Sequence, residues 1–355
     1  MSKFYSLEVI EVIRETANCV SLVLKPQDEG VDFSFKAGQY LTLKAEIEGE
    51  EVRRSYSLSS APYENLLRVG IKEVPGGKFS TYANREIKAG DVLESMQPDG
   101  KFIVDESAKK HIAMAAGSGI TPVLSQIKHV LTSSDDAEFA LFYVNKETAS
   151  IIYKEEIAYL KDKYMGRFQI YNLLTQEPLD AELFSGRLDK ERCNNIFDCI
   201  LSPKDYNVAY LCGPEQMILD CKDALTEAGM DSSSVKFELF TASAPKKDAA
   251  ETTAAADTPK DEVDVLVILD GVTTRVKVKP NGKSILDAAL DAGMDAPFSC
   301  QGGVCCTCRC KMTSGTASMD INYALEPDEV ENNYVLSCQA HPTGSGPWVA
   351  DFDQP

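Results

Sequence analysis

The sequence has few histidines, no excess of basic residues and no long apolar run near its start. Its first residues, MSKFYSLEVIEVIRE, alternate apolar and polar side chains as a strand does, so we expect neither a signal peptide nor a membrane-spanning helix. The 36 Lys and Arg are outnumbered by 55 Asp and Glu, and the net charge of −19 argues against binding to nucleic acid. We therefore expect a cytoplasmic protein that binds neither nucleic acid nor a membrane.

Cysteine, in contrast, is plentiful, and five of the 11 cysteines fall within the stretch CQGGVCCTCRC. Because nothing points to export, clustered thiols favour a metal site over disulfides. The spacing C-x4-C-x2-C is formed by Cys300, Cys305 and Cys308, and 29 residues separate the last of these from Cys338. This is the spacing of plant-type [2Fe–2S] ligands. The two adjacent glycines in the loop would let its backbone aim N–H groups at the sulfurs.

Two alternatives stay open at this loop. A zinc site with four cysteine ligands would use the same thiols, although such sites usually draw on two short knuckles and only Cys305 and Cys308 form one here. Cys306 and Cys310 fall outside the spacing. We expect both to pack as small apolar residues, the alternative being that Cys306 tunes the cluster.

Residue patterns divide the chain into three predicted domains. Residues 1–106 alternate apolar and polar residues between Gly and Pro, which predicts an antiparallel β-barrel. Residues 107–240 alternate short apolar strands with helical stretches, which predicts a doubly wound α/β domain. Residues 241–262 are rich in Ala, Thr, Pro and charge and predict a flexible linker. In residues 263–355 a hairpin and a helix precede the cysteine loop, which predicts a small α+β domain.

Two stretches of the predicted barrel carry residue types that suit a flavin nucleotide. In RRSYSLSS, Arg54 suits a pyrophosphate, Tyr56 the face of a flavin ring and Ser57 its polar edge. In VPGGKFSTYA, backbone N–H groups and hydroxyls would hold phosphate oxygens. The residues concerned are Gly76, Gly77, Ser80 and Thr81. Each stretch alone also fits a solvated strand or an ordinary turn.

A glycine turn follows the first strand of the predicted α/β domain. The stretch HIAMAAGSGITPVLSQI places Gly117, Ser118 and Gly119 directly after an apolar strand. Thr121 is then predicted to cap the next helix, with Pro122 at its first position. The positive end of that helix would face an anionic pyrophosphate, although strand–glycine–helix turns also occur without a ligand.

The order and spacing of these motifs resemble those of oxygenase reductases in the ferredoxin–NADP reductase family. The likeness extends over the whole chain and is most specific in SILDAALDAGMDAPFSCQGGVCCTCRCKMTSG and NYALEPDEVENNYVLSCQAHP. It implies FAD in the barrel, NAD(P)H in the α/β domain, and a [2Fe–2S] cluster in a β-grasp ferredoxin domain. It also identifies G-x-G-x-T-P as the nicotinamide-nucleotide loop.

The same resemblance implies roles for residues near the site of hydride transfer. The stretch YLCGPEQM contributes Cys212, Gly213 and Pro214 as a second nicotinamide motif, with the cysteine near the carbon that gives up hydride. In KFELF, Glu238 and Phe240 would lie near the flavin, the alternative being a terminal strand with Phe240 in the core. The residues predicted to line the reacting centre are Tyr56, Ser57, Cys212 and Glu238.

The choice between NADPH and NADH depends on two residues after the strand FALFYVN. Lys146 would contact a 2′-phosphate as a point charge, whereas Glu147 would bond a ribose hydroxyl. The family resemblance favours NADPH, with NADH as the alternative.

Three cofactors explain three domains. NAD(P)H delivers two electrons together as hydride, a [2Fe–2S] cluster accepts one at a time, and FAD exchanges electrons in both ways. Hydride transfer needs no general acid or base, which suits a chain with only three histidines. The resemblance implies a di-iron oxygenase as the electron acceptor. The alternatives are a steroid or ring-hydroxylating oxygenase or, from a different class, a cluster-based carrier or redox sensor.

Overall fold

The computed structural model describes residues 3–28, 30–240, 262–279 and 282–354. The described chain forms two compact units, one made of residues 4–240 and one that contains the C-terminal residues. The predicted linker lies outside the described residues, apart from Glu262. No helix of the described ranges is both long and apolar enough to span a membrane.

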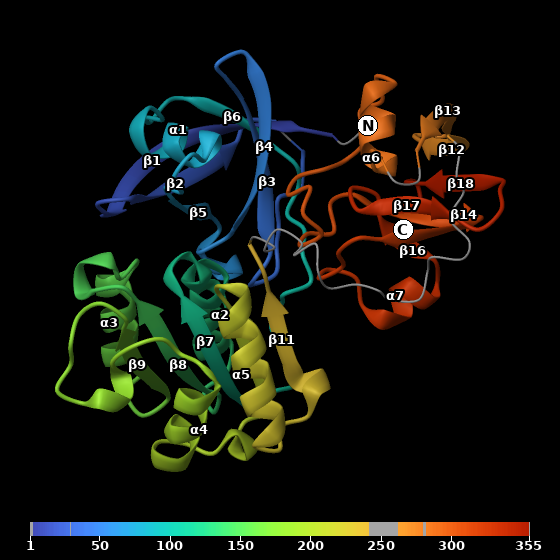
Figure 1. The fold of residues 1–355 in the computed structure, drawn as a ribbon. Helices are drawn as coiled ribbons and strands as arrows, with labels where there is room; N and C mark the ends of the chain where they lie inside the picture. Colours follow the sequence, from blue (N-terminus) through green and yellow to red (C-terminus); the bar gives the residue numbers. More distant parts are fainter. Residues whose placement is uncertain (1–2, 29, 241–261, 280–281, 355) are drawn as a thin grey trace. The chain divides into compact units, whose positions relative to one another are not determined.

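Six antiparallel strands and one helix build the first part of the 4–240 unit (Figure 1). They are β1 (Tyr5–Thr16), β2 (Cys19–Pro26), β3 (Tyr40–Ile47), β4 (Glu50–Ser57), β5 (Leu67–Lys72), α1 (Lys78–Arg85) and β6 (Val92–Ser95). The strand order is β4-β3-β6-β1-β2-β5. An antiparallel bridge between Leu58 and Val69 joins the end of β4 to β5. This bridge closes the sheet into the predicted barrel around a core of alternating apolar residues.

The second part of the same unit is a parallel sheet flanked by helices. Its elements are β7 (Lys110–Ala116), α2 (Ile120–Ser133), β8 (Glu138–Asn145), α3 (Lys154–Lys163), β9 (Phe168–Leu174), α4 (Lys190–Cys199), β10 (Val208–Cys212), α5 (Glu215–Glu227) and β11 (Val235–Glu238). The strand order β11-β10-β7-β8-β9 is parallel throughout. The chain thus reverses its direction of winding between β7 and β10. In such sheets ligands bind in the crevice outside the carboxyl ends of these two strands.

The start of α2 differs from the prediction. A 3₁₀ turn over Gly117–Gly119 leads directly into a helix that begins at Ile120, so Thr121 does not cap it and Pro122 is not its first residue. The hydroxyl of Thr121 instead donates a hydrogen bond to the carbonyl of Ser118, at 2.9 Å. Because Gly119, the last residue of the turn, already has right-handed helical backbone angles, the helix starts earlier than the Thr-Pro signal suggests.

A buried lysine joins the barrel to the α/β part. Lys128 of α2 is only 2% exposed. Its Nζ lies 2.9 Å from a carboxylate oxygen of Glu64 and 2.6 Å from one of Glu156. Arg68 of β5 contacts the same Glu156 at 2.8 Å. Glu64 and Arg68 belong to the barrel, whereas Lys128 and Glu156 belong to the α/β part. The network therefore links the two parts.

The C-terminal unit has a mixed five-stranded sheet, a two-stranded sheet and two short helices. Its elements are β12 (Val263–Leu269), β13 (Val272–Val278), α6 (Ile285–Asp291), β14 (Arg309–Ser314), β15 (Thr316–Met319), α7 (Pro327–Glu331), β16 (Tyr334–Leu336), β17 (Ala340–Thr343) and β18 (Trp348–Asp351). The order is β13-β12-β18-β14-β16, with β12 parallel to β18. The hairpin of β12 and β13 and the helix α6 match the predicted elements.

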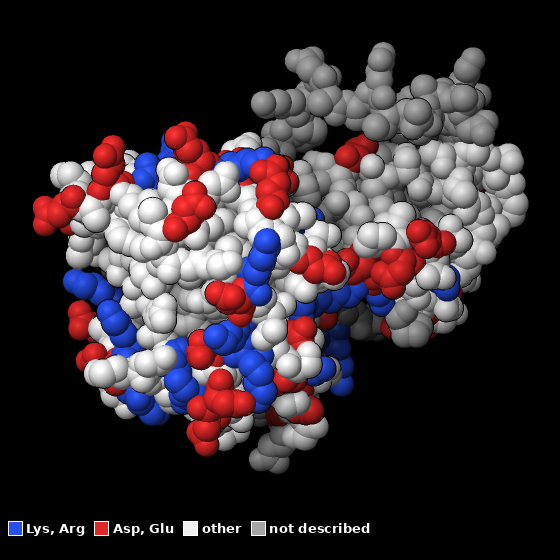
Figure 2. Space-filling view, turned by 90° about the horizontal axis from the view of Figure 1, so that it is seen from below, with Lys and Arg blue, Asp and Glu red and all other residues white. Residues whose placement is uncertain are grey.

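Charged side chains of both signs are interspersed on the face of the molecule in Figure 2. Several form exposed ion pairs, such as Lys109 with Asp136 at 2.8 Å and Lys190 with Glu227 at 2.6 Å. Exposed pairs of this kind contribute little to stability.

Replacing Lys128 by Met should destabilise the 4–240 unit by about 3 kcal/mol, because two partly buried carboxylates lose their shared cation. A urea titration followed by flavin fluorescence measures this unit. The control Lys161→Met, at an exposed position of α3, should change the free energy of unfolding by less than about 0.5 kcal/mol. Equal midpoints for the two variants would show that the network does not stabilise the unit.

Candidate redox sites

The carboxyl ends of β7 and β10 bring the two predicted nicotinamide motifs together. A Cβ atom on Gly119 would lie 2.1 Å from the carbonyl oxygen of Cys212, so only glycine permits this approach. A Cβ atom on Gly213 would lie 3.0 Å from that of Ala116. The glycine turn after β7 and the turn after β10 therefore pack directly against each other.

Two helices begin at this crevice. The Gly117–Gly119 turn leads into α2, and Pro214 stands at the N-terminal boundary of α5. The first backbone N–H groups of a helix have no partner within the helix, and its dipole is positive at that end. The paired helix starts favour an anionic group such as a pyrophosphate.

A lysine that the motifs did not reveal also reaches the glycine turn. Nζ of Lys72, at the end of β5, lies 3.3 Å from the position of a Cβ atom on Gly117. Burial lowers the pKa of Lys72, the nearby Cys19 thiol opposes this effect, and the positive charge of Lys146 adds to it. The predicted Lys146 is exposed and close enough to affect Lys72. The sequence around Lys72 carries no signal for this role, because the contact depends on how the barrel packs on the α/β part.

Three of the four residues predicted at the reacting centre come together. The hydroxyl of Ser57 donates a hydrogen bond to the carboxyl group of Glu238, at 3.1 Å. Cys212 pairs with Glu238 in the parallel register of β10 and β11. Burial raises the pKa of Glu238 to about 8, opposed by the bond from Ser57, and burial also raises the pKa of the Cys212 thiol. The fourth residue, Tyr56, precedes Ser57 and packs its ring 5.4 Å from that of Phe79.

The glycine turn of the barrel has its own internal bonds. Gly76 has φ +74°, and Gly77 stands at the start of α1. The backbone N–H of Val74 donates to the hydroxyl of Ser80 at 3.1 Å, so this hydroxyl holds the turn. The N–H of Thr81 bonds to the carbonyl of Gly77, as in any helix. The first N–H groups of α1 are the groups that suit phosphate oxygens here.

Two further predicted residues are solvent-accessible. Arg54 is exposed, and its guanidinium donates to the carbonyl of Arg53 at 2.6 Å. Phe240 is 38% exposed, so it does not belong to the core. Aromatic, hydroxyl and cationic groups of the barrel thus fit the ring and the phosphates of FAD.

The four predicted cluster ligands form two pairs of sulfurs. Sγ of Cys305 lies 3.1 Å from Sγ of Cys300, and the thiols of Cys308 and Cys338 are likewise hydrogen-bonded to each other. Among the described residues no three His, Cys, Asp or Glu side chains converge to hold a single metal ion. Two sulfur pairs suit two irons better than the single tetrahedral zinc of the alternative.

Backbone N–H groups of the loop point at these sulfurs, as the two glycines led us to expect. The Cys305 thiol lowers the pKa of Cys300, and the N–H groups of Gly302, Val304 and Cys305 act in the same direction against the effect of burial. A Cβ atom on Gly303, which has φ +73°, would lie 2.8 Å from the carbonyl oxygen of Ile321. The loop therefore favours the thiolate of Cys300, whereas the hydrogen-bonded partner thiol and burial raise the pKa of Cys305 and of Cys308.

The two remaining cysteines of the loop have different surroundings. Cys310 is 1% exposed and belongs to the apolar core of the C-terminal unit, as predicted. Cys306 is half-buried, and its thiol donates to the carbonyl of Ala324 at 3.2 Å.

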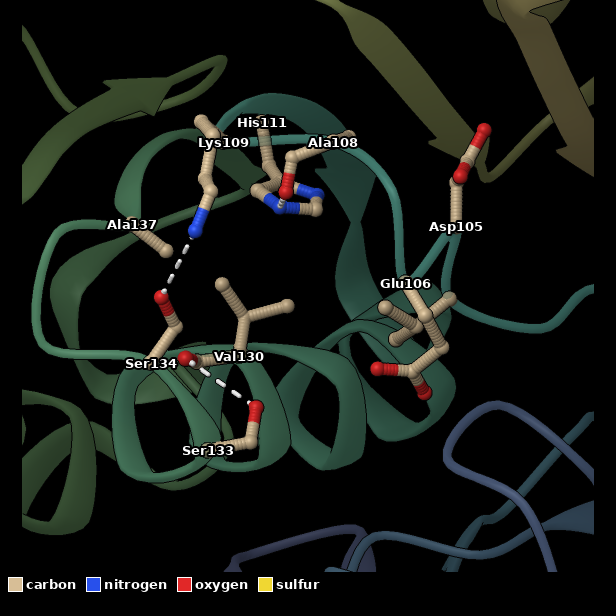
Figure 3. Close-up of a pocket in the computed structure, with 10 residues that line it drawn as sticks. Asp105, Glu106, Ala108, Lys109, His111, Val130, Ser133, Ser134 and Ala137 are labelled. Atoms are coloured by element: carbon tan, nitrogen blue, oxygen red, sulfur yellow. Dashed lines mark hydrogen bonds between the residues drawn. The ribbon is translucent and has the colours of Figure 1, made fainter.

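A pocket of about 210 Å³ lies at the opposite, amino edge of the parallel sheet (Figure 3). Burial lowers the pKa of its His111 to about 4. The ring stacks on Phe139, with centroids 5.7 Å apart, and its Nε2 donates to the carbonyl of Ala108 at 3.1 Å. His111 is thus a neutral packing residue, away from the crevice at the carboxyl edge.

Three family models match the chain in the order of its parts. They are an oxidoreductase FAD-binding domain over residues 6–103, an oxidoreductase NAD-binding domain over residues 114–223, and a 2Fe-2S iron-sulfur cluster binding domain over residues 267–343. The fold and sites thus define an NAD(P)H-dependent flavin and iron–sulfur oxidoreductase.

Relatives and solved structures extend this match over nearly the whole chain. The chain is 38% identical to a protein of Escherichia coli (strain K12) that is named as a subunit of 1,2-phenylacetyl-CoA epoxidase, over 99% of both chains. It is 31% identical to the 3-ketosteroid-9-alpha-monooxygenase ferredoxin reductase component of Rhodococcus rhodochrous, over 96% of this chain and 95% of the other. Phthalate dioxygenase reductase shares the fold, with a TM-score of 0.61, 23% identity and 98% of both chains covered. The chain belongs to the family of ferredoxin–NADP reductase-like reductase components of oxygenases.

Removing one sulfur of the second pair should abolish the cluster. Cys338→Ala should lose the visible charge-transfer absorption and about two irons per chain, because two thiolates are needed for each iron. NAD(P)H-dependent ferricyanide reduction through the flavin should persist. Cys306→Ser is the matched control and should keep its iron. A Cys338→Ala protein with full iron content would show that Cys338 is not a ligand.

The protonation of Glu238 should make stability depend on pH. In the folded protein the pKa of Glu238 is about 8, above the usual glutamate value of 4.5. Between these two pH values the folded chain keeps a proton that the unfolded chain has lost. The free energy of unfolding therefore falls as pH rises through this range. Glu238→Gln resembles the protonated form. The difference in thermal midpoint between this variant and the wild type should therefore grow in favour of the variant up to about pH 8. Glu191→Gln, at an exposed position of α4, should show no such growth. A constant difference would mean that Glu238 ionises normally.

Proposed function

We propose that the chain passes electrons from NADPH, through FAD and a [2Fe–2S] cluster, to a di-iron oxygenase that acts on phenylacetyl-CoA. The observation that carries this proposal is the 38% identity, over 99% of both chains, to a protein named as a subunit of phenylacetyl-CoA epoxidase. The second candidate acceptor is a steroid oxygenase, favoured by the 31% identity to the steroid monooxygenase reductase.

The proposal assigns FAD to residues 1–106, NAD(P)H to residues 107–240, a linker to residues 241–262 and the cluster to residues 263–355. The three family-model matches fall inside the three assigned domains, which supports these boundaries. Thiolates that must stay reduced favour a cytoplasmic location.

The residues at the carboxyl edge would hold and orient the nicotinamide nucleotide. The N–H groups of the Gly117–Gly119 turn and the cations of Lys72 and Lys146 suit its phosphates. Gly213 and Pro214 shape the second wall of the crevice. The cation of Lys146 supports NADPH over NADH, because it suits a 2′-phosphate.

Ser57, Cys212 and Glu238 would form the wall of the reacting centre. FAD, when bound, supplies the conversion between hydride and single-electron transfer. A Glu238 carboxyl with a pKa of about 8 is mostly neutral at pH 7, so it does not repel the negative charge carried by a hydride. Ser57 fixes the orientation of that carboxyl through its hydrogen bond. Tyr56, Arg54 and the start of α1 would hold the flavin ring and its phosphates.

In the C-terminal domain the cluster would be ligated by Cys300, Cys305, Cys308 and Cys338. The N–H groups of the loop would stabilise the negative charge of the cluster. From Val263 onward, 12 Asp and Glu against 6 Lys and Arg leave a net charge of −6. Such an acidic domain suits a basic docking surface on the oxygenase.

Reconstitution with the purified epoxidase and phenylacetyl-CoA tests the proposal. We expect NADPH consumption to be coupled to epoxide formation, with kcat/KM for NADPH above that for NADH. A ratio in favour of NADH would reverse the assignment of the nucleotide. Coupling only to a steroid oxygenase would select the second acceptor. NADPH-dependent ferricyanide reduction distinguishes either reductase from a redox sensor, which would lack it.

A further inference from the structure

Asn145, the last residue of β8, has an amide group without a hydrogen-bond partner. The side chain is only 5% exposed, and neither its Nδ2 nor its Oδ1 is hydrogen-bonded within the described residues. The backbone carbonyl of Asn145 is satisfied, since it accepts from the N–H of Thr175 at 2.9 Å. Buried polar groups are nearly always hydrogen-bonded, so this amide marks a position where a partner is missing.

The position of Asn145 places its amide at the nucleotide crevice. Side chains alternate along a strand, so Asn145 faces the same side of the sheet as Tyr143. The hydroxyl of Tyr143 donates to the carbonyl of Gly117 at 3.0 Å, which ties this side of β8 to the glycine turn. The Asn145 amide lies beside the same hydroxyl but outside hydrogen-bonding geometry. The amide therefore lies next to the turn that suits the phosphates.

The chemistry of an amide indicates which part of a dinucleotide it recognises. The Asn145 side chain offers both donors and an acceptor, and both kinds of atom lack a partner. A phosphate has only acceptor oxygens and would leave Oδ1 unsatisfied. A ribose hydroxyl both donates and accepts, so the hydroxyls of a ribose satisfy both ends. The charges of Lys72 and Lys146, which lie close enough to act on each other, are the groups proposed above for the phosphates.

We propose that Asn145 is a nucleotide-binding residue that hydrogen-bonds a ribose of NAD(P)H through its side-chain amide. This assignment rests on the proposed use of a nicotinamide nucleotide and adds a residue that none of the sequence motifs contains. It is a contact to the sugar, separate from the phosphate contacts of the glycine turn.

Asn145→Leu tests the assignment, because leucine is close to asparagine in size but has no polar atom. We expect Kd for NADP⁺, measured by calorimetry, to rise about tenfold or more, as for the loss of a well-formed hydrogen-bonded contact. KM for NADPH should rise while kcat and the visible spectra of flavin and cluster stay unchanged. Inhibition by inorganic pyrophosphate should also be unchanged, because pyrophosphate lacks a ribose. The control is Asn172→Leu, an exposed asparagine on the neighbouring strand β9.

Other outcomes contradict the proposal in distinguishable ways. Unchanged NADP⁺ affinity in a folded Asn145→Leu would show that the amide bonds only to water or protein. An equal loss of affinity for pyrophosphate would move the contact to a phosphate. If the leucine variant does not fold, Asn145→Asp, which keeps the shape but loses the donors, must weaken NADP⁺ binding for the proposal to survive. Absence of NADP⁺ and NAD⁺ binding by the wild type would overturn the proposed function as well.

Discussion

The contact between the backbone of Gly119 and the carbonyl of Cys212 is the constraint on which the nucleotide site depends. A single methyl group at Gly119 would meet that carbonyl at 2.1 Å and separate the turn after β7 from the end of β10. Because these strands flank the point where the winding of the sheet reverses, separating them would displace the starts of α2 and α5 from each other. It would also shift Cys212, and with it the end of β11 that carries Glu238. Packing of two main chains thus sets the positions of Cys212 and Glu238, the groups that we propose face the reacting atoms.

The barrel contributes to this site by being fixed against the α/β part. A network of charges crosses that boundary and consists of Lys128, Glu64, Glu156 and Arg68. Its Lys128 is almost fully buried. Charge networks of this kind tolerate little displacement, because separating the partners leaves a buried charge that neither a counter-ion nor water stabilises. Such rigidity suits hydride transfer, in which small displacements of the reacting atoms reduce the rate strongly. Ser57 reaches Glu238 across the same boundary.

Features that depend on local sequence were the ones that could be predicted. The spacing of Cys300, Cys305 and Cys308 predicted one loop that brings sulfurs together, and the alternation of strands and helices reflects local periodicity. Features that depend on tertiary contacts could not be read in this way. Lys72 and Asn145 sit in ordinary strands, and only the register of those strands brings them to the crevice. The start of α2 was mispredicted because the Thr121–Pro122 signal is local, whereas the helical winding of the preceding turn is fixed by its packing on Cys212.

The pairing of the cluster sulfurs has a consequence for how the C-terminal domain matures. Cys300 and Cys305 belong to one short loop, whereas Cys308 and Cys338 are separated by 29 residues that include β14, β15, α7 and β16. If Cys308 and Cys338 hold iron as proposed, that iron would act as a crosslink that closes this long segment, and such a crosslink lowers the entropy of the unfolded chain. Cluster assembly and completion of the fold would then be one coupled event in this domain. Loss of iron would release the segment that links β14 to β16.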